Sequence, residues 1–298
     1  MSPRLGLVCI TASKEIRYRT VTRKRLLAQS VESQRKLLDD IYRDNIQTFD
    51  AALRFCEREG ISLYRIPSSI FPFADEDIGR ELLESLSAAL SRSGARAAAK
   101  NIRLVMHPDQ FVVLSSDSAD VIANSVKILQ MHADIMDLLG QPRSSWALLE
   151  IHGGKSGRAD TLVERIASLP EPIRCRLGLE NDEYAYGADE ISDICTRSGL
   201  PMVFDAHHHV VHDKLPSYEH PSVGEMLLKA RATWAVPEHQ LVHISNGKSG
   251  FNDRQHSDLI ESMPSSYQQA PWIEIEAKSK EEAIRKLRAW QRTGGVAV

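Results

Sequence analysis

The sequence lacks long apolar runs: among its 298 residues, no apolar stretch reaches the ~18 residues that a transmembrane helix requires. A signal-peptide pattern is missing too, because Arg4 and Gly6 interrupt the apolar residues near the N-terminus. We therefore expect a cytoplasmic protein with no membrane partner. No feature of the sequence implies an obligate protein partner.

Cysteine is scarce, and the four cysteines contain no Cys-x-x-Cys pair. This spacing argues against a disulfide framework and against a zinc site built from thiolates. The formal net charge of −3 is small, so the overall charge does not indicate a nucleic-acid partner. An anionic ligand would have to meet a local basic patch.

Short apolar runs alternate with helical patterns along the whole chain. This alternation predicts α/β architecture with parallel strands joined by right-handed crossovers. Eight such pairs predict one (β/α)8 TIM barrel, a single domain over residues 1–298. The expected strands are 4–10, 61–66, 102–106, 146–151, 175–179, 202–204, 240–244 and 272–275. The expected helices are about 31–59, 78–100, 119–139, 159–169, 188–197, 223–233, 254–262 and a last one from about 279.

Strands three to eight end in histidine or a carboxylate. Catalytic groups of TIM barrels come from the C-terminal ends of several strands, so we expect these side chains to meet at the barrel mouth. One or more of His207, His208 and His209 belong to the set, and the two-residue period of a strand cannot choose between Glu274 and Glu276. The candidates are His107, His152, Glu180, Asp205, the 207–209 histidines, His243, His256 and Glu276.

Imidazole and carboxylate donors without thiolates suit Zn²⁺ or Mn²⁺. The set is too large for one ion, and it would serve two or three ions if a carboxylate such as Glu180 bridges them. Two ions ~3.5–4 Å apart can activate a water and stabilise both oxygens of a phosphodiester displacement. The residues therefore favour phosphoryl chemistry.

A basic segment follows the first strand and opens on the same face as the candidate ligands. Its cations, opposed by the single acid Glu15, could neutralise DNA phosphates without reading sequence. Beyond His107, Gln110 and Phe111 could enter a duplex and unstack bases, although Phe111 could equally belong to the core. The basic residues are Lys14, Arg17, Arg19, Arg23, Lys24 and Arg25, with Lys155 in another loop of that face.

Taken together, the motifs resemble the UV damage endonucleases, and most closely their deinococcal branch. They run in order through nearly the whole chain. The motifs are Tyr64-Arg65-Ile66 with Ser68-Ser69, His107-Pro108-Asp109-Gln110-Phe111, His152-Gly153-Gly154, Glu180-Asn181-Asp182, Phe204-Asp205-Ala206-His207-His208, His243-Ile244-Ser245, His256-Ser257-Asp258 and Glu276-Ala277-Lys278.

The resemblance implies a barrel related to endonuclease IV, with up to three Mn²⁺ or similar ions. It implies incision of damaged double-stranded DNA immediately 5′ to ultraviolet photoproducts, and Gln110 and Phe111 would enter the duplex opposite the lesion. The chain departs from the family pattern at Leu7, where members have tyrosine, and at Leu241, where members have a carboxylated lysine. The ligands it implies are His107, His152, Glu180, Asp205, His208, His243, His256 and Glu276.

We therefore expect a DNA repair endonuclease acting on cyclobutane pyrimidine dimers and 6-4 photoproducts. Metal-activated hydroxide would attack the phosphorus and leave a 3′-hydroxyl and a 5′-phosphate, with Glu180, Glu276 and His243 as catalytic residues. Mn²⁺ is the first expectation, with Zn²⁺ or Mg²⁺ as alternatives. The rival functions are an endonuclease IV-like abasic-site endonuclease, a metal-dependent sugar isomerase and a non-catalytic module that binds damaged DNA.

Overall fold

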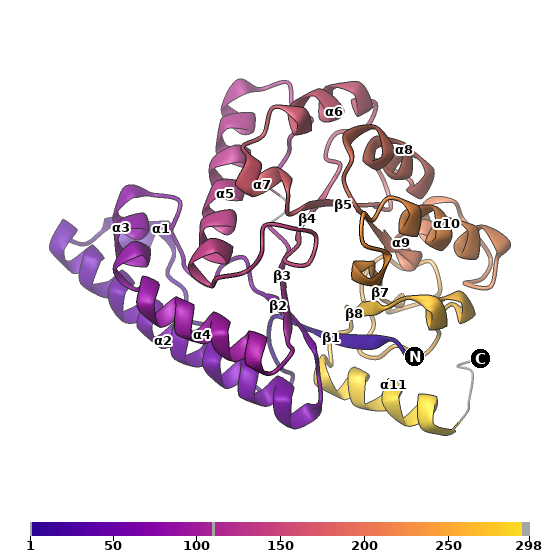
Figure 1. Cartoon of the computed structure of the whole chain (residues 1–298), viewed down its shortest axis with the longest axis horizontal. Coiled ribbons are helices and arrows are strands. Elements are labelled where there is room, and N and C mark those ends of the chain that lie inside the picture. Colours follow the sequence, from indigo (N-terminus) through magenta and orange to yellow (C-terminus); the bar gives the residue numbers. More distant parts are fainter. Residues whose placement is uncertain (1, 109–110, 294–298) are drawn as a thin grey trace.

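The computed structural model describes residues 2–108 and 111–293, and its eight parallel strands close into a barrel in the order of the sequence (Figure 1). The predicted (β/α)8 TIM barrel is confirmed. The strands are β1 (Arg4–Val8), β2 (Leu63–Ile66), β3 (Arg103–Met106), β4 (Leu149–His152), β5 (Leu177–Glu180), β6 (Met202–Asp205), β7 (Leu241–Ile244) and β8 (Trp272–Ile275).

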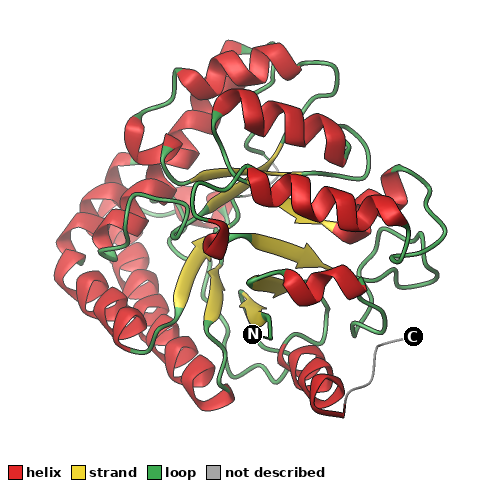
Figure 2. Cartoon of the chain, turned by 45° about the vertical axis from the view of Figure 1, so that its right-hand side comes forward, coloured by secondary structure: helices red, strands yellow, loops and turns green. Residues whose placement is uncertain are grey.

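Figure 2 shows the strands at the centre and the helices arranged around them. Among the described helices, none combines the length and the apolar content needed to cross a lipid bilayer. The helices are α1 (Arg23–Leu27), α2 (Val31–Glu59), α3 (Asp77–Ser85), α4 (Ser87–Ala99), α5 (Ala119–Leu138), α6 (Ala159–Ala167), α7 (Glu171–Arg174), α8 (Ala188–Ser198), α9 (Ala206–His212), α10 (Pro221–Ala232) and α11 (Glu281–Thr293). Two short 3-10 helices, η1 (Pro237–His239) and η2 (Ser265–Gln269), precede β7 and β8.

Helix α2 shows how local chemistry sets an element's limits. The Ser30 side chain accepts a hydrogen bond from the Ser33 amide and caps its first turn. The helix stops at Gly60, whose φ of 64° lies in the left-handed region that glycine adopts without a steric penalty. Between these ends, Leu38, Tyr42 and Phe49 form part of a buried stripe against the barrel. The predicted helix 31–59 is confirmed.

Two predicted helices differ from the structure. The pattern over 78–100 forms two helices, α3 and α4, which meet at Leu86. The helix expected over 254–262 is wrong. There the Asp253 carboxylate accepts hydrogen bonds from the Ser249 and Gln255 amides, which commits the backbone to a tight loop instead of a helix.

The barrel interior consists of layers, because inward-facing residues recur every second position along each strand. The lower layer is an apolar cluster separate from the main core between barrel and helices. Two residues further along several of the same strands, the inward side chains become charged. The lower layer contains Leu63, Val105, Leu148, Val203, Leu241 and Trp272, with Trp234 beside them.

Candidate metal centre

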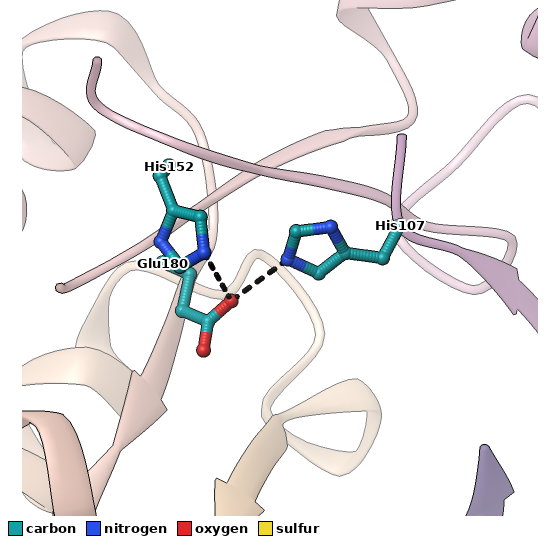
Figure 3. A group of neighbouring side chains, drawn as sticks. All are labelled: His107, His152 and Glu180. Carbon is teal, nitrogen blue, oxygen red and sulfur yellow. Dashed lines mark hydrogen bonds and ion pairs between the residues drawn. The ribbon is translucent and has the colours of Figure 1, made fainter. Parts of the chain in front are cut away.

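The C-terminal ends of β3, β4 and β5 bring two imidazoles onto one carboxylate. Figure 3 shows His107 and His152 pointing at the same oxygen of Glu180. The Nε2 atom of His107 lies 2.9 Å from Glu180 Oε2, and Nε2 of His152 lies 3.7 Å from it. Adjacent strands place them so, because His152 and Glu180 are paired in the β4–β5 register. The predicted convergence of these three residues is present.

Glu180 is held as a carboxylate by its neighbours. It is almost completely buried, and burial alone raises the pKa of a carboxyl group. The charges of His243 and His152 and the hydrogen bond from His107 outweigh that effect and lower the pKa of Glu180 well below its usual range. Its two oxygens face different imidazoles, since Oε1 lies 2.9 Å from His243 Nδ1. This position suits a bridging ligand.

Helix α9 decides which of the three consecutive histidines faces the centre. Asp205 is its N-cap and accepts a hydrogen bond from the His208 amide at 2.8 Å. His208 then points inward, with Nδ1 3.4 Å from Glu180 Oε1. His207 instead contacts the Tyr218 hydroxyl and the Asp253 carbonyl oxygen, and His209 contacts Ser222. The sequence left this choice open because a short helix at the strand end was not foreseen.

Strands β7 and β8 complete the mouth. His243 is fully buried, and its Nδ1 atom lies 3.7 Å from Glu276 Oε1. His256, in the loop after β7, reaches Glu276 Oε2 at 3.9 Å. Both glutamates that the strand period could not separate point inward, at different depths. Glu276 lines the mouth, whereas Glu274 is fully buried and lies 2.8 Å from His243 Nε2.

Two potential ligand atoms without a hydrogen-bond partner indicate that these residues fit divalent ions. Asp205 Oδ2 and His152 Nδ1 are buried and lack a hydrogen-bond partner within the described chain. Buried polar atoms are normally paired, so these atoms are available to a ligand. Three groups at the mouth place their ligand atoms within 4.8 Å of one another, and they share Glu180 and Asp205. The groups are His107 with His152 and Glu180; Glu180 with Asp205 and His208; and Asp205 with His243 and Glu276.

A hollow of about 690 Å³ opens above this set. Phe111 lies on its wall and is 68% exposed, which excludes the alternative that it belongs to the core. Gln110 lies outside the described residues. A large exposed aromatic ring beside a polar hollow is a typical site for stacking against nucleic-acid bases. The hollow is also lined by Arg65, His107, His152, Glu180, His208, His256 and Glu276.

The basic segment after β1 presents its cations to solvent, but they are not equivalent. Arg19 pairs with Asp44, and Arg23 pairs with Glu76 at 2.7 Å. Lys155, in the loop after β4, is exposed and lies 3.6 Å from Asp117. Within the described chain, four exposed cations of the segment make no salt bridge, which leaves their charge available to an anionic partner. They are Lys14, Arg17, Lys24 and Arg25.

Sequence reasoning missed Arg65 and Glu150. Arg65 extends into the barrel from β2, and Glu150 does so from β4, where it shares the inward face with His152. Each could have been found from the sequence as a charged residue within an apolar strand, two positions from another inward-facing residue, because this spacing places both side chains on the inward face. The family-variant Leu241 lies in the apolar layer below His243, and Leu7 packs in the main core.

Comparisons with known proteins agree with this geometry. The profile of the family described as UV-endonuclease UvdE matches residues 3–295. The chain belongs to the UV-endonuclease UvdE family. A Nostoc protein named UV DNA damage endonuclease is 54% identical over 98% of this chain and 91% of its own length. Its Deinococcus radiodurans counterpart is 51% identical over 96% of this chain and 95% of its own length. The family resemblance and the expectation of an enzyme are both confirmed.

Solved structures share the UvdE barrel. The crystal structure of SacUVDE is 24% identical, covers 98% of this chain and 99% of its own, and has a TM-score of 0.78. Endonuclease IV from Thermus thermophilus is 16% identical, covers 98% of this chain and all of its own, and has a TM-score of 0.59. At these identities the likeness concerns the fold alone. It matches the expected endonuclease IV-like barrel.

Proposed function

We propose that this UvdE-family chain incises DNA immediately 5′ to cyclobutane pyrimidine dimers and 6-4 photoproducts, leaving a 3′-hydroxyl and a 5′-phosphate. The observation that carries the proposal is the convergence of imidazole and carboxylate atoms from six strands beneath an open hollow. The relatives named UV DNA damage endonuclease supply the substrate class. The single-domain organisation over residues 1–298 stays a prediction.

The mouth groups would hold two or three divalent ions, with Glu180 and Asp205 as shared ligands. Nitrogen and oxygen donors without sulfur suit Mn²⁺, with Zn²⁺ or Mg²⁺ as alternatives. Such ions supply an activated water at neutral pH and stabilise charge on the phosphate. The proposed ligands are His107, His152, Glu180, Asp205, His208, His243, His256 and Glu276.

Each catalytic side chain has a separate task in this proposal. Glu180 presents one oxygen to His107 and the other to His243, so it would act as a ligand shared between neighbouring ions. Glu276 lines the hollow, where the scissile phosphate would arrive. His243 is fixed from below and keeps Nδ1 directed at both carboxylates.

The DNA would lie across the mouth. Phe111, with the neighbouring Gln110, would enter the duplex opposite the lesion, where a damaged step reduces the cost of unstacking. The exposed basic residues Arg17, Arg19, Arg23, Lys24 and Arg25, together with Lys155, would contact phosphates. Such contacts position the backbone and carry no sequence information.

Nicking of irradiated, abasic and intact plasmid, measured side by side with chelator or with added Mn²⁺, tests the proposal. We expect Mn²⁺-dependent nicking of irradiated DNA well above that of the other two. Equal or faster cleavage of abasic DNA would instead support an abasic-site endonuclease. The variant Glu276→Gln keeps the shape of the side chain but weakens its ligand oxygen, so we expect its nicking rate to fall by about 10²–10³-fold. A parental rate would remove Glu276 from the mechanism.

A further inference from the structure

A second group of ionisable side chains lies directly beneath the mouth. It consists of Arg65 from β2, Glu150 from β4 and Glu274 from β8, which all contact His243 of β7. Both glutamates are fully buried, and Arg65 is 6% exposed. Charges buried this deeply are costly unless they are paired and hydrogen-bonded. None of these three residues belongs to the ligand set proposed above.

The Arg65 guanidinium occupies the centre of this lower group. Its Nε atom donates to Glu274 Oε2 at 2.8 Å, and its Nη1 atom donates to Glu276 Oε1 at 2.6 Å. Its Nη2 atom contacts Glu274 as well and lies 3.5 Å from Glu150 Oε2. Glu150, His243 and Glu274 have the spacing of an ion site, with ligand atoms within 4.8 Å. The guanidinium already supplies a positive charge beside them.

His243 connects the lower group with the mouth through its two ring nitrogens. Nδ1 faces Glu180 and Glu276, whereas Nε2 lies 2.8 Å from Glu274 Oε2 and 3.1 Å from Glu150 Oε2. A histidine that binds a metal usually donates its other N–H to a carboxylate, which fixes the tautomer and the ring orientation. The two carboxylates below the ring and the Arg65 guanidinium, whose Nη2 atom lies 2.9 Å from Nε2, hold the ring in place. Nδ1 therefore stays directed at the mouth.

Arg65 also restricts Glu276. One oxygen of Glu276 accepts the hydrogen bond from Nη1, and the other faces His256. The carboxylate is therefore held in one rotation, and Oε2 is the oxygen that would be left to hold an ion.

We propose that Arg65 is a positioning residue and the fixed cation of the lower group. It sets the orientation of His243 both directly and through Glu150 and Glu274, and it sets that of Glu276 directly. This inference rests on the proposed function only in requiring that the mouth binds divalent ions. It assigns Arg65, Glu150 and Glu274 a role in preparing the centre before any DNA arrives.

Removing the cation has two separable consequences. Without Arg65, two buried carboxylates lose their counter-charge, so the fold is weakened even in the absence of metal. Independently, His243 and Glu276 lose the contacts that align them, so ion affinity falls. Glu150 Oε1 and Glu274 Oε1 already lack hydrogen-bond partners within the described chain, so no spare donor is at hand to compensate.

The test compares Arg65→Met, Arg65→Lys and the double variant Arg65→Met with Glu274→Gln. The midpoint of thermal unfolding is measured after chelation, and Mn²⁺ affinity is measured by the electron paramagnetic resonance of free Mn²⁺. We expect Arg65→Met to unfold roughly 5 °C or more below the parent. We expect the double variant to recover at least half of that loss, because one of the two uncompensated charges is gone.

Mn²⁺ affinity separates positioning from stability. We expect it to fall about 10–100-fold in Arg65→Met and to stay low in the double variant, since restored stability does not realign His243 or Glu276. Arg65→Lys keeps the charge, so it should preserve most of the stability and part of the affinity. Parental Mn²⁺ affinity in Arg65→Met, or affinity that recovers together with stability in the double variant, would overturn the proposal.

These measurements use no DNA, so the two proposals can fail independently. A parent that binds Mn²⁺ with the expected Arg65 dependence but does not nick irradiated DNA would refute the proposed function alone. A parent that nicks irradiated DNA, with an Arg65→Met variant whose affinity is unchanged, would refute the role of Arg65 alone.

Discussion

The lower and upper halves of the barrel interior are built from the same strands and have opposite chemistry. On β2, the inward-facing residue changes from apolar Leu63 to ionisable Arg65 two positions further along the strand. The same change occurs on four other strands. The lower half can be filled for packing alone, whereas the upper half contains charges that are buried in close proximity. The further steps run from Leu148 to Glu150, Val203 to Asp205, Leu241 to His243 and Trp272 to Glu274.

Two buried arginines, one in each half, differ in the same way in the groups that they contact. Arg103, in the lower half, donates to the carbonyl oxygens of Ser145, Trp146 and His239, and its guanidinium lies 5.3 Å from the Trp272 ring. Arg65 donates to carboxylates. Burial lowers the pKa of Arg103 to about 10, and the charges of Glu150 and Glu274 oppose this only in part. Around Arg65 the carboxylates outweigh burial and raise the pKa. The first arginine closes the barrel floor, and the second serves the mouth.

The largest expected effect comes from replacing the carboxylate at the centre of the upper half. In Glu180→Gln, one amide replaces the two oxygens that face His107 and His243, so the shared ligand is lost. We expect the nicking rate on irradiated plasmid to fall by about 10³-fold or more. Glu190→Gln, an exposed change on α8, is the matched control and should nick at the parental rate. Substantial activity in Glu180→Gln would show that Glu180 is dispensable.

The corresponding change in the lower half should affect stability and spare catalysis. Leu148 is fully buried in the apolar layer, so Leu148→Ala leaves a cavity that costs about 2–5 kcal/mol of unfolding free energy. Urea unfolding measures this loss. Nicking by the folded protein, corrected for the folded fraction, should stay near the parental rate. A large fall in that rate with unchanged stability would contradict the view that the lower half serves stability and the upper half serves catalysis.

The upper half should also make the metal-free protein sensitive to pH. Burial lowers the pKa of His208, but Asp205, Glu180 and Glu183 outweigh it and raise that pKa to about 9. Because the folded pKa exceeds the unfolded value of about 6.5, protonated His208 stabilises the metal-free fold. This contribution is complete below about pH 6.5 and is lost as pH rises through about 9.

Thermal unfolding of the chelated protein from pH 6 to 9.5 checks this expectation. The midpoint should fall across the window, and His208→Gln should flatten the dependence. Mn²⁺ affinity should rise over the same range, because an ion must displace the proton. A midpoint that rises with pH in the chelated parent would contradict the sign of the effect.

The sequence was sufficient for the barrel and for most of the mouth, because both depend on short-range periodicity. Strand ends at His107, His152, Glu180, Asp205 and His243 could be located from apolar runs alone, and barrel closure then brings them together. What could not be predicted depends on tertiary contacts. The orientation of His208 depends on a seven-residue helix whose N-cap is itself a candidate ligand. The role of Arg65 depends on carboxylates from two distant strands.

The smallest expected effect concerns charges outside the barrel, which solvent screens and the interior does not. Arg17 and Arg25 are exposed and make no salt bridge in the described chain, whereas Arg19 and Arg23 are paired with Asp44 and Glu76. Each phosphate contact that is lost lowers the slope of log affinity against log salt by about 0.9.

Replacing both Arg17 and Arg25 with alanine should therefore lower that slope by about 2, to the same extent on irradiated and intact DNA, when binding is measured by fluorescence anisotropy with chelator present. The nicking rate at saturating DNA should not change, because neither side chain lines the hollow. Replacing Arg19 and Arg23 should have a smaller effect, since their charges are already partly neutralised by acids. Equal reductions of the slope by the two pairs of substitutions would contradict this expectation. They would show that pairing with Asp44 and Glu76 does not weaken the phosphate contacts of Arg19 and Arg23.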